Sequence, residues 1–238
     1  MTKRPQDGAI LEVAGVAKGF TLHAQGGVEI PVFREMSMSV AAGEAVALAG
    51  ASGTGKSSLL RMLYGNYHCR EGAIRVCHQG GWINLARADA RAVLDVRRHT
   101  IGYISQFLRV VPRVPVLDVV AEPVMARGAD RASARVRAAK LLERLRIPER
   151  LWSLSPVTFS GGEQQRVNVA RGFAVPYPVL LLDEPTASLD GANRSTVIEM
   201  IGEARKSGSA IVAIFHDDEV RRQVCGRAID MRQFKWAS

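Results

Sequence analysis

The sequence lacks a long apolar run, and this absence argues against a chain that spans a membrane. No stretch approaches the ~18 uninterrupted apolar residues that a transmembrane helix needs. Residues 1–7 lead into no hydrophobic segment of the kind found in a secretory signal peptide. We therefore expect a soluble, cytoplasmic protein with no direct membrane insertion.

Cysteine is also scarce, which argues against a disulfide framework. Cys69, Cys77 and Cys225 make an odd number of three, and no pair has the C-x-x-C spacing. This usage favours reduced thiols in the cytosol. The pairs His68-Cys69 and Cys77-His78 could together be drawn as a four-ligand zinc site. Residues 72–76 look like a short strand, however, which would hold these two pairs apart.

Positive charge is abundant, with a formal net charge of +9 over 238 residues. This length and a hydrophobic content of 47% suit one globular domain, residues 1–238, with a helical insert at about 106–160. A basic chain can bind nucleic acid, a membrane surface or an acidic partner protein. The arginines are spread along the sequence, which favours an acidic partner or a nucleotide site and argues against nucleic acid.

A glycine-rich stretch stands between an apolar run, 45–49, and a helix-like run, 59–63. Its residues match the pattern G-x-x-x-x-G-K-[ST], in which backbone N–H groups surround an anion at a helix N-terminus. Lys56 is placed to reach the β- and γ-phosphates of a nucleotide, and Ser57 to offer its hydroxyl to Mg²⁺. We call this stretch the glycine loop; it consists of Gly50, Ala51, Ser52, Gly53, Thr54, Gly55, Lys56, Ser57 and Ser58.

Polar residues also follow several buried-strand candidates. The run 101–104 leads to Gln106, and the run 210–215 leads to His216. The apolar run that begins at 179 ends in two carboxylates, Asp183 and Glu184. The carboxyl ends of strands are where doubly wound sheets place ligands, so these residues are candidates for a site.

A second helix start suited to phosphate occurs later in the chain. Ser160, Gly161, Gly162 and Glu163 pass directly into the amphipathic run 167–173. A serine and two glycines at a helix N-terminus can hold an anion, although Ser-Gly-Gly alone is a common turn.

The remaining pattern predicts a mixed architecture. Alternation predicts strands at 10–16 and 36–40, with two short strand-like pieces around a Gly26-Gly27 turn. Further strands are expected at 73–76 and 82–85. Helices are expected at 117–125 and 132–147. In the second helix the apolar spacing predicts a buried face made of Ala138, Leu141, Leu142 and Leu145.

A row of basic residues lines the other face of that helix. They are Arg135, Arg137, Lys140 and Arg144. Either they form a solvated helix surface, which we prefer, or they contact an acidic partner.

Taken in order, these motifs resemble those of the ATP-binding-cassette (ABC) ATPases, from Phe20 to His216. The resemblance implies an α/β P-loop NTPase fold, with an antiparallel β subdomain and a helical insert, and it implies ATP and Mg²⁺ as ligands. The sequence departs from the family pattern at Phe159, where leucine is usual, and at Glu163, where glutamine is commoner. Neither departure removes a phosphate ligand.

The same resemblance implies a role for each site residue. Phe20 would stack on adenine, while Ser57 and Gln106 help to hold Mg²⁺. Asp183 would anchor the metal through water, Glu184 would polarise the attacking water, and His216 would contact the γ-phosphate. The catalytic set is then Lys56, Gln106, Glu184 and His216, and the nucleotide-binding set is Phe20, the glycine loop, Ser160, Gly161, Gly162, Glu163 and Asp190.

Three stretches, 21–27, 106–114 and 119–123, look like the ATP-binding subunit of the bacterial phosphonate carbon–phosphorus lyase system. That resemblance implies an ATPase that acts with soluble lyase subunits, in the pathway that makes ribose 1-methylphosphonate 5-triphosphate. The chain shows no residues for the phosphonate chemistry itself. Two alternatives stay open: the ATP-binding subunit of a membrane exporter of the lipoprotein-release or macrolide type, and a cassette that works on nucleic acid.

The two phosphate-competent helix starts predict a pair of subunits. In a cassette fold the glycine loop and Ser160–Gly162 lie far apart in one chain, so both can contact one nucleotide only if a facing subunit supplies the second. The partner would be a copy of this chain or a related cassette.

Overall fold

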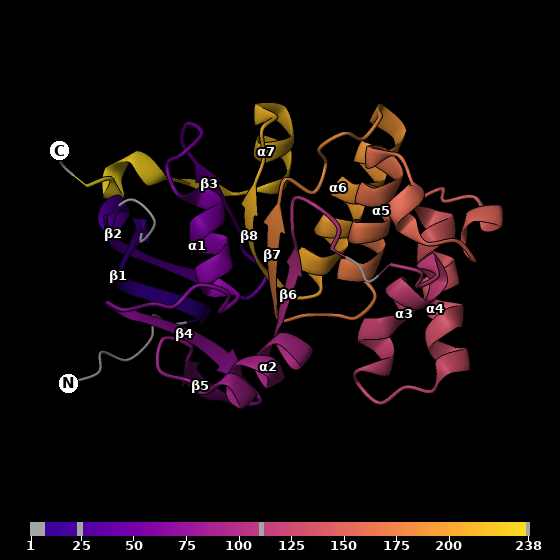
Figure 1. Ribbon diagram of the computed structural model, residues 1–238, viewed down its shortest axis with the longest axis horizontal. Helices are drawn as coiled ribbons and strands as arrows, with labels where there is room; N and C mark the ends of the chain where they lie inside the picture. Colours follow the sequence, from indigo (N-terminus) through magenta and orange to yellow (C-terminus); the bar gives the residue numbers. More distant parts are fainter. Residues whose placement is uncertain (1–7, 23–25, 110–111, 237–238) are drawn as a thin grey trace.

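The computed structural model describes residues 8–22, 26–109 and 112–236, and it contains two sheets. The antiparallel sheet has the order β2-β1-β4-β5, and the parallel sheet has the order β6-β7-β8-β3-β9. Figure 1 shows the antiparallel sheet beside α1 and the helices α3 to α6 on the far side of β6. This arrangement confirms the expected mixed α/β fold with an antiparallel sheet.

The strands of the antiparallel sheet are β1 (Ala9–Leu22), β2 (Val28–Ala41), β4 (Ala73–His78) and β5 (Gly81–Asn84). The strands of the parallel sheet are β3 (Ala45–Ala49), β6 (Ile101–Ile104), β7 (Val179–Asp183), β8 (Ala210–Ile214) and β9 (Arg227–Asp230). Strands β7 and β8 are buried along their whole length, as expected for a sheet covered on both faces.

The helices are α1 (Lys56–Leu63), α2 (Ala90–His99), α3 (Val116–Met125), α4 (Arg131–Arg144), α5 (Gly161–Gly172), α6 (Gly191–Lys206) and α7 (Asp218–Val224). Short 3-10 turns occupy Glu149–Leu151, Pro156–Thr158 and Met231–Phe234. In the described part of the chain, no helix combines the length and the apolar character needed to cross a membrane.

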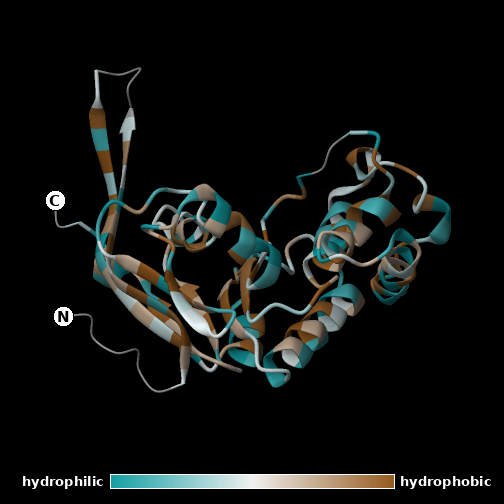
Figure 2. Ribbon diagram, turned by 90° about the horizontal axis from the view of Figure 1, so that it is seen from below, coloured by the Kyte–Doolittle hydropathy of each residue, from teal (hydrophilic) through white to brown (hydrophobic). Residues whose placement is uncertain are grey.

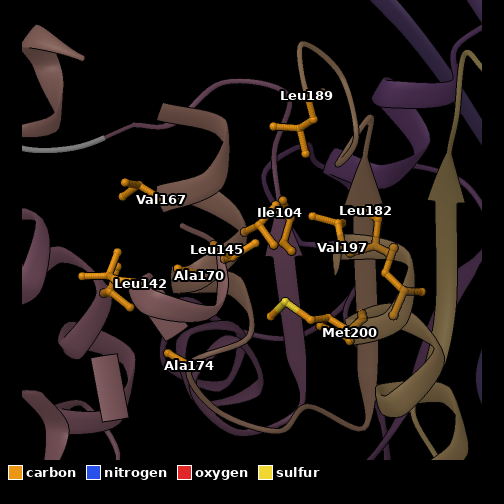
Figure 3. Close-up of a cluster of buried hydrophobic side chains, with 14 of the residues drawn as sticks. Ile104, Leu142, Leu145, Val167, Ala170, Ala174, Leu182, Leu189, Val197 and Met200 are labelled. Carbon is orange, nitrogen blue, oxygen red and sulfur yellow. The ribbon is translucent and has the colours of Figure 1, made fainter. Parts of the chain in front are cut away.

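One core joins the helices α3 to α6 to one face of the parallel sheet. Figure 3 shows Ile104 and Leu182 from the sheet, Leu142 from α4 and Val167 from α5 in this cluster. Each of these four side chains is fully buried. Figure 2 shows that most helices alternate apolar and hydrophilic residues along their length, as expected for helices packed on one side. Helix α5, which carries the second phosphate-competent helix start, is therefore packed onto the sheet whose strand β3 leads into the glycine loop.

The N-terminal strands differ from the expectation of several short strands. The structure joins them into two strands of 14 residues each, whose outer part extends away from the body of the molecule (Figure 2). Irregularities in register between Val13 and Lys18 break the strict alternation, and Gly15, at φ 59, donates its N–H to Ser37 Oγ. These bulges explain why periodicity alone divided the strands. Residues 23–25, which precede the expected Gly26-Gly27 turn, lie outside the described residues.

Helix α4 begins near the expected residue but ends at Arg144 instead of 147. Leu145 is the C-cap, and the next residue, Arg146, has a φ of 53, a left-handed conformation that cannot continue the helix. Ala138, Leu142 and Leu145 are fully buried, whereas Leu141 is only partly buried.

The basic face of α4 differs from a freely solvated surface, because three of its arginines have partners in this chain. Arg135 pairs with Asp118 on α3, and Arg144 forms two hydrogen bonds with Glu203 on α6. Arg137 donates to the carbonyl of Ala174. These contacts connect α4 to its neighbours, while Lys140 is exposed.

Candidate active site

The glycine loop has a backbone shape that only glycine adopts easily. Gly50, Gly53 and Gly55 have φ values of 134, 80 and 89. A Cβ on Gly55 would lie 2.6 Å from Val32 Cγ1, so the loop is packed tightly on β2. Helix α1 begins at Lys56, immediately after this glycine. The result is a backbone loop open to an anion at a helix N-terminus.

Lys56 closes the glycine loop on itself. Its Nζ donates to the carbonyl oxygens of Gly50, at 2.7 Å, and Ala51, at 2.8 Å. The ammonium group therefore lies over the loop, where it can reach a phosphate held by the loop's N–H groups.

Asp183 is the buried acid of the site. It ends β7, its exposed fraction is 1%, and Ser57 on α1 donates to its Oδ1 at 3.1 Å. Burial raises the pKa of this carboxyl, while the hydrogen bonds from Ser57 and Tyr103 act in the opposite direction. A buried carboxylate beside a serine hydroxyl is an oxygen-donor set that suits Mg²⁺.

Glu184 brings together the ends of three parallel strands. Gln106, which follows β6, donates its Nε2 to Glu184 Oε2 at 3.4 Å, and Nε2 of His216, which follows β8, lies 2.7 Å from Oε1. The Glu184 side chain is 12% exposed and that of His216 is 72% exposed. Glu184 has a φ of 55, an unusual backbone conformation for a residue with a side chain. The carboxylate is thus held beside Asp183 at the sheet edge.

Ser160 begins α5 with a capping box. Its Oγ accepts from the N–H of Glu163 at 3.3 Å, and Glu163 Oε2 accepts from the N–H of Ser160 at 3.0 Å and from its Oγ at 2.7 Å. These bonds from Ser160 lower the pKa of Glu163. Glutamate at this position therefore has a local structural role in starting the helix.

The two glycines at the start of α5, Gly161 and Gly162, have different surroundings. A Cβ on Gly162 would lie 3.0 Å from the carbonyl oxygen of Ser188, so this position must be small for packing within the chain. A Cβ on Gly161 would meet nothing within 4 Å. The small size of Gly161 is therefore not needed by this chain alone.

Phe20 and Asp190 lie outside the cluster around Glu184. Phe20 packs edge-on against Tyr67, with ring centroids 5.5 Å apart, and Lys18 Nζ lies 4.5 Å from its ring centroid. The cavity beside Phe20, of about 590 Å³, is lined by none of the glycine-loop residues. Asp190 caps α6 by accepting from the N–H and Nδ2 of Asn193, which lower its pKa.

The structure thus brings some of the predicted site residues together and leaves others apart. Ser57 contacts Asp183, and Gln106 and His216 contact Glu184. Helix α5 lies apart from α1, with strands of the parallel sheet between them in Figure 1. The assigned roles of these residues stay predictions.

Sequence reasoning missed three polar residues that support the site. Tyr103 donates its hydroxyl to Asp183 Oδ2 at 3.2 Å, and Gln165 donates to the carbonyls of Glu184 and Pro185. Asn168 donates to the carbonyl of Ser105 at 2.6 Å, next to Gln106. Burial raises the pKa of Tyr103 to about 12. A tyrosine in a buried strand was an available signal, because a buried phenol needs a partner.

Comparison with known proteins gives the family of this chain. Residues 33–187 match the family model described as "ABC transporter", which is more than half of the chain. The chain belongs to the ABC transporter family. As an ABC ATPase it binds ATP with Mg²⁺ and hydrolyses ATP, and the oxygen donors of Ser57 and Asp183 fit that metal.

Two kinds of curated relative are similar to this chain. It is 38% identical over 212 residues to the lipoprotein-releasing system ATP-binding protein LolD of Maricaulis maris, covering 89% of each chain. It is 33% identical over 223 residues to the macrolide export ATP-binding/permease protein MacB of Shigella flexneri, covering 94% of this chain and 33% of the relative. The chain therefore spans about a third of the macrolide export protein.

Solved structures show the same fold. The dimeric structure of a bacterial ABC transporter cassette has a TM-score of 0.83 and 25% identity, covering 93% of this chain and 95% of that one. A dimeric post-hydrolysis state of that cassette, bound to ADP and Pi, has a TM-score of 0.83 and 26% identity. Cassettes of this fold therefore form dimers.

Proposed function

We propose that this chain is the ATP-hydrolysing subunit of a larger machine, with Glu184 as the residue that activates water. The observation that carries this proposal is the position of the Glu184 carboxylate between Gln106 and His216. A carboxylate fixed at this point can accept a proton from a water molecule that attacks the γ-phosphate.

The remaining roles follow from geometry and charge. The N–H groups of the glycine loop and the ammonium group of Lys56 bind the phosphates and balance their charge. Ser57, Gln106 and Asp183 are the residues that would hold Mg²⁺, and the metal would supply positive charge to balance that of the phosphates. His216 orients Glu184 and contacts the γ-phosphate.

Head-to-tail pairing completes the site in this proposal. Ser160 and Gly161 form an exposed helix start with open space around Gly161, and they are separated from the glycine loop of their own chain. A facing subunit would place this start on the nucleotide bound by the other chain. Binding of a ligand shared by two chains favours the pair, and hydrolysis removes the shared phosphate.

The relatives favour a membrane protein as the partner, and the chain would then work at the cytoplasmic face of the membrane. The proteins similar to this chain belong to a lipoprotein-releasing system and to macrolide export. They support the exporter interpretation that the sequence left open. A groove of about 430 Å³, lined by residues that include Gln106, Phe107, Arg109 and Arg171, supports this proposal as the place where the partner would dock. Phe107 has an exposed fraction of 72%, which is high for a phenylalanine, and arginines surround it.

A carbon–phosphorus lyase assembly is the second candidate partner. The observation in its favour is the sequence of three stretches: 21–27, 106–114 and 119–123. Residues 23–25 and 110–111 within them lie outside the described part of the structure. The relatives compared above give this candidate no support.

Co-purification from the native host distinguishes the two candidates. The tagged chain, extracted in mild detergent, is expected to bring down a membrane permease, identified by mass spectrometry. Recovery of soluble lyase subunits instead would favour the second candidate. Phe107→Asp should abolish capture of the partner, whereas Val136→Asp, at a residue 58% exposed on α4, should not. Equal capture by both variants would contradict docking at this groove.

A further inference from the structure

Tyr103 lies at a point where sequence analysis expected only a buried strand residue. It is on β6, and its hydroxyl donates to Asp183 Oδ2 at 3.2 Å. The other oxygen of the same carboxylate, Oδ1, accepts from Ser57 at 3.1 Å. Two donors on two different elements therefore hold the two oxygens of Asp183.

The tyrosine is itself fixed by its neighbours. Its ring packs against Tyr64, with centroids 5.1 Å apart, and the positive charge of Arg61 on α1 lowers the Tyr103 pKa, against the larger effect of burial. Arg61 Nη1 also donates to the hydroxyl of Tyr67 at 2.9 Å. The Tyr103 ring is thus packed against Tyr64, and its hydroxyl is bonded to the Asp183 carboxylate.

We propose that Tyr103 is a positioning residue that fixes the orientation of Asp183 toward the Mg²⁺ of the bound nucleotide. The proposal rests on the role proposed for Asp183 above. The terminal torsion of an aspartate is broad, so a carboxylate with one donor can rotate, whereas one with a donor on each oxygen cannot. Partners that orient residues around a metal in this way affect metal affinity strongly.

The two residues that donate hydrogen bonds to Asp183, Ser57 and Tyr103, differ in what else they bind in the proposed site. Ser57 has two roles in the proposed site, because an oxygen lone pair would bind Mg²⁺ while its O–H donates to Asp183. Tyr103 has no such second duty, and its hydroxyl can keep Asp183 in place both with and without nucleotide. Loss of this hydroxyl should therefore weaken the metal-dependent part of nucleotide binding and leave the metal-free part unchanged.

The test compares nucleotide binding with and without metal in four proteins: the wild type, Tyr103→Phe, Tyr64→Phe and Asp183→Asn. Calorimetry with a non-hydrolysable ATP analogue measures affinity in EDTA and across a Mg²⁺ titration. In Tyr103→Phe we expect a rise of about tenfold in the Mg²⁺ concentration that gives half of the metal-dependent gain in nucleotide affinity. This is the size expected for the loss of one hydrogen bond to a charged group. Affinity in EDTA should change less than about twofold, which also shows that the variant is folded.

The controls separate the possible failures. Tyr64→Phe removes a neighbouring phenol hydroxyl and should titrate as the wild type does. A wild-type titration for Tyr103→Phe would overturn the proposal and leave the tyrosine as a residue that only fills space. An equal loss of affinity in EDTA would overturn it as well, because the tyrosine would then act on the whole nucleotide pocket. A wild-type titration for Asp183→Asn would instead contradict the metal role of Asp183.

Discussion

Nε2 of His216 lies 2.7 Å from Oε1 of Glu184, although the two residues follow different strands. The Glu184 backbone is also tied to the second strand, because its N–H donates to the carbonyl of Ile214 at 3.0 Å. The carboxylate is mostly covered and the imidazole ring is exposed. The histidine is therefore open to a bound phosphate, while the carboxylate is held within the protein.

Glu184→Gln should abolish most hydrolysis and preserve ATP binding. Glutamine keeps the shape and can still contact Gln106 and His216, but it cannot accept the proton of water. A positioned base contributes ~10²- to 10⁴-fold to the rate, so turnover should fall by that factor. Phosphate release and calorimetry with ATP measure the two properties. Glu203→Gln, at a surface ion pair on α6, is the control and should hydrolyse ATP normally. Near-normal activity of Glu184→Gln would identify another base.

Lys56→Ala should lower ATP binding and turnover together. The ammonium group is the cation that lies over the glycine loop, and hydrogen bonds to charged groups are worth ~1.5–3 kcal/mol, so affinity should fall ~10- to 100-fold. Lys206→Ala, at an exposed lysine at the end of α6, is the matched control for the loss of one positive charge. If Lys56→Ala kept its affinity and lost only turnover, Lys56 would act in the reaction step alone.

The strands that surround the site and the glycine loop were predictable because their signals are local. An apolar run that leads into glycines, Lys56 and Ser57 identifies a phosphate loop without any tertiary information. The polar residues after β6, β7 and β8 were candidates for the same reason. Their convergence on Glu184 depends on strand order, which the sequence alone does not state.

Other features were not predictable because they depend on tertiary contacts. Helix α2 is short and buries only Val96, and α6 buries the polar Asn193 and Thr196, which an apolar pattern does not mark. Tyr103 and Gln165 are polar residues whose partners are distant in sequence. Pattern reasoning reads neighbours along one element and does not detect such pairs.

Glu44→Gln should destabilise the chain at neutral pH and have little effect in acid. Burial raises the pKa of Glu44, but the bonds from Arg227, at 2.6 Å, and from the N–H of Ala41, at 2.8 Å, outweigh it and lower the pKa. A lowered folded-state pKa stabilises the fold above the unfolded pKa, and this stabilisation is lost as pH falls through the folded pKa. Urea unfolding at pH 7 and near pH 3 measures both cases. If the free energy of unfolding differed between the wild type and Glu44→Gln by the same amount at both pH values, the charge of Glu44 would not be involved.

Gly161→Asp should prevent pairing without disturbing the chain itself. A Cβ at Gly161 meets nothing within 4 Å, so the side chain fits in the single subunit. In a head-to-tail pair the new carboxylate would face the phosphates of the nucleotide on the other chain, and like charges repel.

The decisive measurement uses Glu184→Gln protein, because slow hydrolysis keeps ATP bound. With ATP and Mg²⁺, light scattering should show this protein as a pair, and the double mutant with Gly161→Asp as a monomer that binds ATP with unchanged affinity. The control is Gly202→Asp. Gly202 lies on a different helix, α6, and also has open space around it, so this variant should still pair. Its pairing would show that an added aspartate alone does not separate the subunits. If Glu184→Gln and its Gly161→Asp double mutant had equal masses, both paired or both monomeric, Gly161 would not face the nucleotide of the second subunit.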